Sequence, residues 1–152
     1  MYQKLAWGYA LFFFLVVLAG HLPGFTNQQG LLFGLFMIDP IDDVLHSFSG
    51  IWAAFSAWRS PQEAKRYFRW FGIYYTTDAF LGFLTGYSIL DLIRGNFGAN
   101  VGYSMINMQH NLAVNFPHFV IGPLALFIGY CLKDTLDRHE KKSAKQKTKR
   151  TK

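Results

Sequence analysis

Residues 39–50 read DPIDDVLHSFSG, and residues 111–122, which lie 72 positions later, read NLAVNFPHFVIG. Four positions match in kind between these stretches, with the same spacing of four, three and four residues. The matched pairs are Asp39 with Asn111, Asp43 with Asn115, His46 with His118, and Gly50 with Gly122. Because residues three and four apart share one face of a helix, each stretch predicts a helix whose polar stripe carries a histidine and a glycine. We therefore expect two copies of one helical unit, with the histidines facing each other.

The net charge of the chain lies at its C-terminal end. The whole chain of 152 residues carries +6, and residues 133–152 contain nine Lys/Arg against three Asp/Glu. Residues 1–132 contain six charges of each sign and are rich in apolar and aromatic side chains. A polar, strongly basic segment cannot bury enough apolar surface to fold. We therefore expect one folded domain over residues 1–132 and a basic, disordered tail over residues 133–152.

Four apolar segments are long enough to cross a lipid bilayer, which takes about 17–25 residues of helix. They are Leu5–Leu22, Ile41–Trp58, Tyr67–Tyr87 and Phe116–Leu132. The alternative is a soluble helical bundle with an aromatic core. Stretches such as Ala10–Ala19 and Phe119–Tyr130 lack the polar face that a soluble surface helix needs. The pattern therefore favours four membrane spans.

The basic residues predict the topology of these spans. Fourteen of the fifteen Lys/Arg fall on one side if both termini are cytoplasmic, as the positive-inside rule expects, and only Arg94 falls outside. The predicted fold is therefore an all-α, four-helix transmembrane bundle with both termini cytoplasmic. It consists of two tandem helical hairpins that form a parallel internal repeat.

The ends of the spans carry further signals. No small-x-small cleavage site follows the first apolar segment, so we interpret it as a span and not as a signal peptide. Asp39 before Pro40 is typical of a helix N-cap. Asn115 caps the fourth span, or Pro117 lies within a helix that begins near Asn111. The apolar stretch 30–38 is too short to span, so we expect it at the interface or partly re-entrant. The single Cys131 excludes an internal disulfide.

Asp78 lies in the third span without a basic residue nearby in its own helix. An ionisable group inside a bilayer is costly and requires a partner, a water-filled cavity or protonation. Pairing with His46 or with His118 would satisfy it. The structural alternative for both histidines is a hydrogen bond that joins two helices, while Gly50 and Gly122 allow the backbones to approach closely.

The paired histidines also suggest a cofactor. Two imidazoles on parallel helices can ligate b-type haem from opposite sides, Gly50 and Gly122 would leave room beside the ring, and Arg94 would pair with the propionates. A divalent metal held by His46, His118 and Asp78 is the other option. The sequence contains no His-x-x-x-His or Glu-x-x-His motif that would support the metal.

The sequence contains few motifs that would indicate an enzyme or a nucleic-acid-binding protein. The chain lacks a nucleophile elbow, a phosphate-binding loop and a zinc-protease motif, so we do not expect an enzyme. Basic residues of the tail suit anionic lipid headgroups, and no aromatic interleaving indicates nucleic acid. The leading interpretation is a non-enzymatic membrane protein that is accessory to a larger complex or self-associates, for example as a homo-oligomer. The rival is a haem or metal redox module.

The run LLFGLFMID over residues 31–39, followed by the two Asn/Asp-x-x-His-x-x-x-Gly motifs at residues 43–50 and 115–122, resembles an uncharacterised family of small four-span bacterial membrane proteins. The resemblance covers residues 5–132 and leaves out the basic tail. It implies the four-span fold and a bacterial cytoplasmic membrane, and it carries no established activity. The chain departs from the family pattern at Asp78 and Pro117.

Overall fold

The computed structural model of the chain describes residues 1–28, 31–34, 36–37, 40–86, 89 and 108–132. The prediction of a helical fold is confirmed, because each of the four apolar segments coincides with a helix. The elements are α1 (Tyr2–His21), β1 (Leu31–Leu32), β2 (Phe36–Met37), α2 (Pro40–Arg59), α3 (Pro61–Thr85), α6 (Met108–Leu126) and the π-helical turn η1 (Phe127–Cys131). The predicted tail, residues 133–152, lies outside the described residues.

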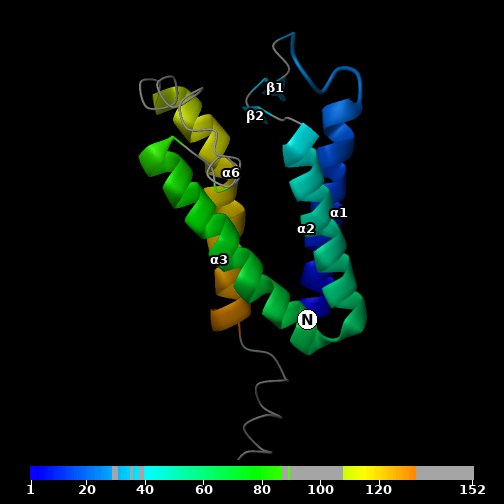
Figure 1. Cartoon of the computed structure of the whole chain (residues 1–152). Coiled ribbons are helices and arrows are strands. Elements are labelled where there is room, and N and C mark those ends of the chain that lie inside the picture. Colours follow the sequence, from blue (N-terminus) through cyan, green and yellow to red (C-terminus); the bar gives the residue numbers. More distant parts are fainter. Residues whose placement is uncertain (29–30, 35, 38–39, 87–88, 90–107, 133–152) are drawn as a thin grey trace, which may run out of the picture.

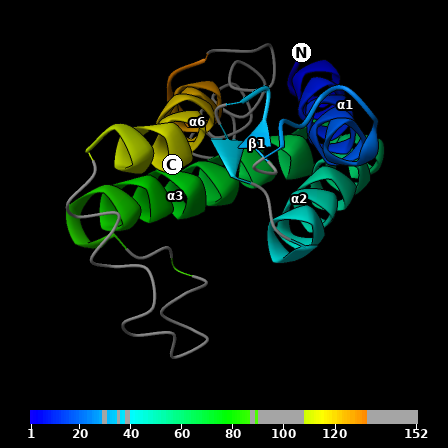
Figure 2. The ribbon, with the colours of Figure 1, turned by 90° about the horizontal axis from the view of Figure 1, so that it is seen from above.

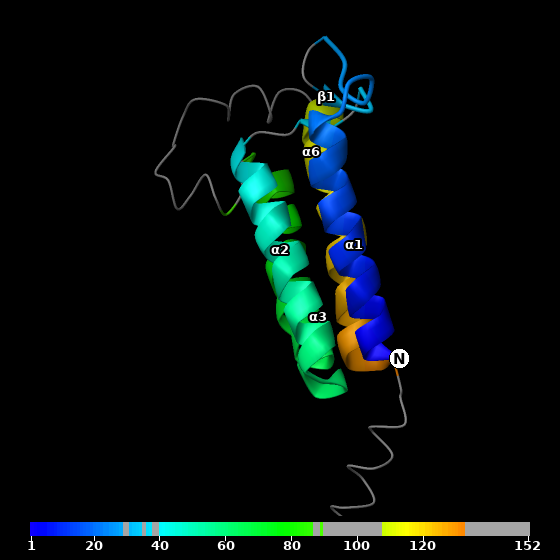
Figure 3. The ribbon, with the colours of Figure 1, turned by 90° about the vertical axis from the view of Figure 1, so that its right-hand side faces the viewer.

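The helices form two hairpins, α1 with α2 and α3 with α6 (Figures 1 and 3). A tight connection joins the hairpins: Ser60 caps α3 by accepting the backbone N–H of Glu63 at 3.1 Å, and Pro61 takes the first helical position. Figure 1 shows the hairpins close together at this end and further apart toward β1 and β2. Seen from above in Figure 2, α3 and α6 lie on one side and α1 and α2 on the other. We call the end at β1 and β2 the outer end, and the opposite end, where α2 connects to α3, the inner end.

A short antiparallel β-hairpin at the outer end is the element that the sequence did not predict. Leu31 pairs with Met37 and Leu32 with Phe36. The turn between the strands uses Phe33 and Gly34 with φ of 54° and 72°. Our expectation of an interfacial or partly re-entrant stretch missed this hairpin, because a turn that places a phenylalanine at positive φ has no sequence signature.

The start of the fourth helix decides whether Asn115 caps this helix or Pro117 lies within a longer one. Helix α6 begins at Met108, upstream of Asn115, and contains Pro117 and Pro123. Pro117 therefore lies inside a longer helix, and Asn115 is not its N-cap. Pro40 is the first residue of α2, as expected, whereas Asp39 falls outside the described residues.

Small residues allow the helices of each hairpin to pack closely. A Cβ on Gly50 would lie 3.2 Å from the ring of Phe14 on α1, and one on Gly122 would lie 2.6 Å from the backbone nitrogen of Thr76 on α3. Phe14 and Thr76 are 62 positions apart, as Phe13 and Tyr75 are. The sequence repeat is therefore also a repeat of helix contacts, in which a 62-residue offset relates α1 to α3.

The cores of the hairpins follow the same repeat. Ala53 and Ala125, which are 72 positions apart, are both fully buried. Two side chains reach equivalent backbone carbonyls: Gln3 Nε2 donates to the oxygen of Ala57 at 2.7 Å, and Arg69 Nε donates to that of Gly129 at 2.9 Å. A cluster of aromatic rings on α1 and α3 fills the space between the hairpins.

By length and composition, one helix among the described residues, Tyr2–His21, is apolar enough to cross a membrane. A shorter apolar helix runs over Asn115–Cys131.

Candidate functional site

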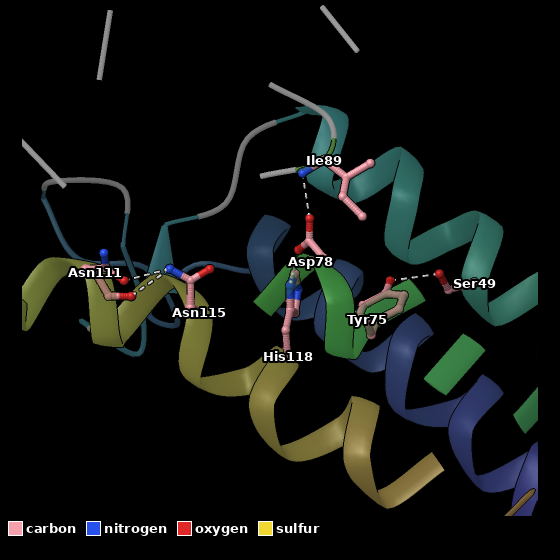
Figure 4. Close-up of polar contacts among 7 residues, drawn as sticks. All are labelled: Ser49, Tyr75, Asp78, Ile89, Asn111, Asn115 and His118. Atoms are coloured by element: carbon pink, nitrogen blue, oxygen red, sulfur yellow. Dashed lines mark hydrogen bonds and ion pairs between the residues drawn. The ribbon is translucent and has the colours of Figure 1, made fainter. Parts of the chain in front are cut away.

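An imidazole and a carboxylate join the two helices of the second hairpin (Figure 4). His118 Nδ1 on α6 lies 2.7 Å from Asp78 Oδ2 on α3. Because a carboxylate can only accept, Nδ1 carries the hydrogen of this bond, and Nε2 is left as the other polar atom of the ring. The side chains are only 19% and 15% exposed, so the bond is largely shielded from water. Of the two partners that the sequence allowed for Asp78, the structure has His118.

The second oxygen of Asp78 is also occupied. Oδ1 accepts the backbone N–H of Ile89 at 2.8 Å (Figure 4). One carboxylate therefore ties together α3, α6 and the chain just beyond α3. Both oxygens have a donor, as a charge shielded from water requires.

Tyr75, one helical turn before Asp78, links this pair to the first hairpin. Its ring meets the imidazole of His118 edge-on, with centroids 4.9 Å apart. Its hydroxyl lies 2.8 Å from Ser49 Oγ on α2, and Ser49 is only 3% exposed. Sequence reasoning missed both residues, although Tyr75 shares a helical face with Asp78.

His46 has different surroundings. Its ring stacks on Phe13 of α1 with centroids 5.6 Å apart, and its Nδ1 is buried with no hydrogen-bond partner. Phe13 in turn lies 5.9 Å from the ring of Tyr75. The two histidines are thus linked through two aromatic rings, because Tyr75 also contacts the ring of His118. The two rings that connect the histidines are Phe13 and Tyr75, and a direct face-to-face arrangement of His46 and His118 stays a prediction.

Polar residues at the start of each histidine helix form hydrogen bonds within that helix or to the other helix of its hairpin. Asn115 Nδ2 donates to the backbone oxygen of Asn111 at 2.9 Å (Figure 4). Asn111 Nδ2 donates to the backbone oxygen of Phe83 on α3 at 3.1 Å. In the first hairpin Asp43 Oδ2 pairs with His21 Nε2 of α1 at 3.0 Å. Sequence reasoning also missed this contact.

The haem and metal hypotheses also involved Gly50, Gly122 and Arg94. Gly50 and Gly122 both face a neighbouring helix at close range, which favours their role in helix packing over room for a haem ring. The part of the chain that the structure describes contains no cluster of three or more His, Cys, Asp or Glu that could hold a metal ion. Arg94, the proposed partner of haem propionates, lies outside the described residues.

The sequence and the structure were compared with known proteins. The chain matches no protein-family model, no curated protein and no solved structure.

Proposed function

We propose that this chain is a four-span integral protein of the bacterial cytoplasmic membrane, with both termini cytoplasmic. In this proposal its buried polar site joins helices and does not carry out catalysis. The observation that carries the proposal is the distribution of large apolar side chains. They are exposed on all four helices, and those on α2 form a stripe with heptad spacing, each between 55% and 69% exposed. The stripe consists of Val44, Phe48, Ile51, Phe55 and Trp58.

The second hairpin has an equivalent stripe. Phe116, Val120, Phe127 and Tyr130 lie 72 positions after four members of the first stripe, and each is about half exposed. Soluble monomers rarely expose continuous stripes of large apolar side chains such as these two. In a membrane, lipid chains would cover the stripes and keep them away from water. The positions that face inward are small or aromatic, as in membrane helix pairs.

The charges at the inner end support the orientation. Three basic groups lie over aromatic rings there: Arg59 over Phe55, Lys65 over Tyr2 and Arg69 over Tyr130, with distances to the ring centroids of 5.8, 5.3 and 4.9 Å. Basic and aromatic side chains gather where a span meets a cytoplasmic surface. Anionic lipid headgroups are the partner that this end and the basic tail would attract.

Within the membrane, the polar bonds would act as connectors. Asp78–His118 joins α3 to α6, and Ser49–Tyr75 joins α2 to α3. In a bilayer such bonds hold helices in register, because lipid offers them no alternative partner. The exposed stripes would then be available for self-association or for a larger membrane complex.

Cysteine labelling tests the topology. In a Cys131→Ser background, Gln28→Cys near the outer end should react with a membrane-impermeant maleimide in intact cells. Gln62→Cys, at the exposed connection between the hairpins, should react only after permeabilisation. Labelling of Gln62→Cys in intact cells would refute the proposed orientation, and extraction of the protein by alkaline carbonate would refute membrane insertion.

A haem-binding redox module is the second candidate, and one observation favours it. His118 is oriented by a carboxylate on Nδ1, which is how proteins commonly orient metal-ligating histidines. A reduced-minus-oxidised visible spectrum of the purified protein, with His46→Ala alongside, decides the question. A Soret band and an α-band that disappear in the variant would establish the cytochrome, and a flat spectrum would remove it.

A further inference from the structure

Two basic residues extend the face of α3 that packs against α6 and η1. Gly122 of α6 lies against Thr76 on this face. Gly129 of η1, seven residues further along the chain, lies against Arg69, because an added Cβ would be 2.9 Å from Arg69 Cγ. Lys65 shares this face, since it lies one helical turn from Arg69 toward the inner end. The two cations are therefore neighbours beside the end of η1.

The guanidinium group of Arg69 is fixed in one orientation. Its Nε donates to the backbone oxygen of Gly129 at 2.9 Å, and its central carbon lies 4.9 Å from the centroid of the Tyr130 ring. The bond to Gly129 caps the carbonyl end of η1, and this capping uses one of the five N–H groups of the guanidinium. Within the described part of the chain, no hydrogen bond or ion pair engages the two terminal nitrogens. The N–H groups of these nitrogens are therefore available to a ligand.

Lys65 is the second cation of the site, and it brings in the first hairpin. Its Nζ lies 5.3 Å from the centroid of the Tyr2 ring on α1. Tyr2 is fully buried, and its hydroxyl donates to the backbone oxygen of Leu132 at 2.5 Å. Figure 1 shows the start of α1 and the end of α6 at the inner end. The pair Lys65 and Arg69 therefore contacts a tyrosine from each hairpin, which are Tyr2 and Tyr130.

The charges around the pair favour an anion. Glu63, the acidic residue closest in sequence, is bound elsewhere, because its Oε1 pairs with Arg66 Nη1 at 2.8 Å. Among the described residues, Glu63 is the one carboxylate at the inner end. Two like charges four residues apart on a helix repel each other. An anion that contacts both Lys65 and Arg69 would remove this repulsion.

We propose that Lys65 and Arg69 form a specific binding site for the phosphate of one anionic phospholipid. The fork of Arg69 matches two phosphate oxygens, and Lys65 supplies a second charge. The surroundings favour a lipid over a free phosphate ion. Tyr130 is 58% exposed and Phe127, which lies three residues earlier, is 54% exposed, so apolar surface continues from the guanidinium toward the bilayer. The lipid would stabilise the contact between the hairpins, because the site contains residues of both.

The site rests on the proposed membrane function and is tested with the full chain, purified in a non-ionic detergent. The probes are phosphatidylglycerol and, as the lipid without net charge, phosphatidylcholine. Native mass spectrometry measures the lipid retained, and the midpoint of thermal unfolding measures stabilisation. We expect phosphatidylglycerol to be retained and to raise the midpoint, and we expect phosphatidylcholine to do neither. Arg69→Gln should weaken the apparent affinity for phosphatidylglycerol by about tenfold, because it removes hydrogen bonds to a charged group.

Two further variants make the comparison specific. Arg66→Gln is the matched control, because it removes the same charge from the same helix, but from a side chain that is 69% exposed and paired with Glu63. It should leave the affinity unchanged, and the basic tail is the same in every variant. Lys65→Gln keeps the contact between Arg69 and Gly129 and should also weaken binding. It tests the site even if Arg69→Gln fails to fold, which circular dichroism reports.

Each contrary result has a distinct meaning. Equal losses in Arg66→Gln, Lys65→Gln and Arg69→Gln would show attraction by surface charge alone and would overturn the site, as would equal retention of the two lipids. Stabilisation by inorganic phosphate at the same concentration would show a soluble ligand and overturn the lipid assignment. Extraction of the chain from its membranes by alkaline carbonate would overturn the membrane function itself.

Discussion

The two hairpins repeat the same helix contacts but differ in polar chemistry. In each, the histidine of the second helix meets an aromatic ring of the first, Phe13 for His46 and Tyr75 for His118. In the second hairpin Asp78 lies three residues beyond Tyr75 and binds His118. The equivalent residue in the first hairpin is Val16, and His46 Nδ1 has no partner. The presence of one carboxylate therefore distinguishes the two hairpins: Nδ1 of the histidine has a hydrogen-bond partner in the second hairpin and none in the first.

This difference shows which features of a repeat depend on packing and which on chemistry. The glycines and alanines recur because both hairpins require close helix contact. The carboxylate does not recur, and the first hairpin instead makes an exposed contact at its outer end, between His21 and Asp43. We therefore expect substitutions at equivalent positions to affect the two hairpins unequally.

The largest inequality should follow removal of Asp78. Asp78→Ala leaves His118 and the N–H of Ile89 without their acceptor, so we expect the free energy of unfolding to fall by about 3 kcal/mol. His21→Ala, which breaks the pair with Asp43, should cost less than about 1 kcal/mol, because the His21 side chain is 68% exposed. Unfolding in mixed detergent micelles with increasing SDS measures both changes. Equal losses would mean that the shielded pair contributes no more than the exposed one.

The glycines provide the next contrast. Gly122→Ala places a Cβ 2.6 Å from the backbone nitrogen of Thr76, and backbone cannot move aside easily, so we expect a loss of about 2 kcal/mol. Gly50→Ala places its Cβ 3.2 Å from the end of the Phe14 ring, which can rotate away. We expect a loss below about 1 kcal/mol there. Unfolding in SDS again distinguishes them, and a larger loss for Gly50→Ala would contradict the contact geometry.

These contrasts also show how much of the molecule can be predicted from sequence. Hydropathy and the 72-residue repeat located all four helices and the helix faces that carry His46, His118 and the glycines. Sequence could not decide which histidine binds Asp78, because both share the same position in the repeat. That choice depends on α3 lying against α6 within one hairpin. Ser49–Tyr75 was missed for a different reason, because it joins helices of different hairpins and no spacing rule relates them.

Substitutions in the hydrogen bond between the hairpins should lower the free energy of unfolding by a smaller amount. Ser49→Ala and Tyr75→Phe each remove one partner of the same hydrogen bond, and we expect each to cost about 1 kcal/mol. The double variant should cost little more than either single variant, because only one bond is lost. A double-mutant cycle of unfolding free energies measures this coupling. Additive losses would show that the two hydroxyls bond to other groups.

The smallest effect is expected at His46, and it tests the difference between the hairpins most directly. His46→Leu removes a buried nitrogen that has no partner and keeps an apolar side chain against Phe13, so stability should change by less than about 1 kcal/mol. His118→Leu should be far more destabilising, because it leaves the carboxylate of Asp78 without its imidazole partner. Introducing Val16→Asp places a carboxylate at the position equivalent to Asp78. If Val16 and Asp78 are equivalent in space, His46→Leu should become destabilising in that background alone. An unchanged effect would show that the two hairpins differ in backbone geometry as well as in one side chain.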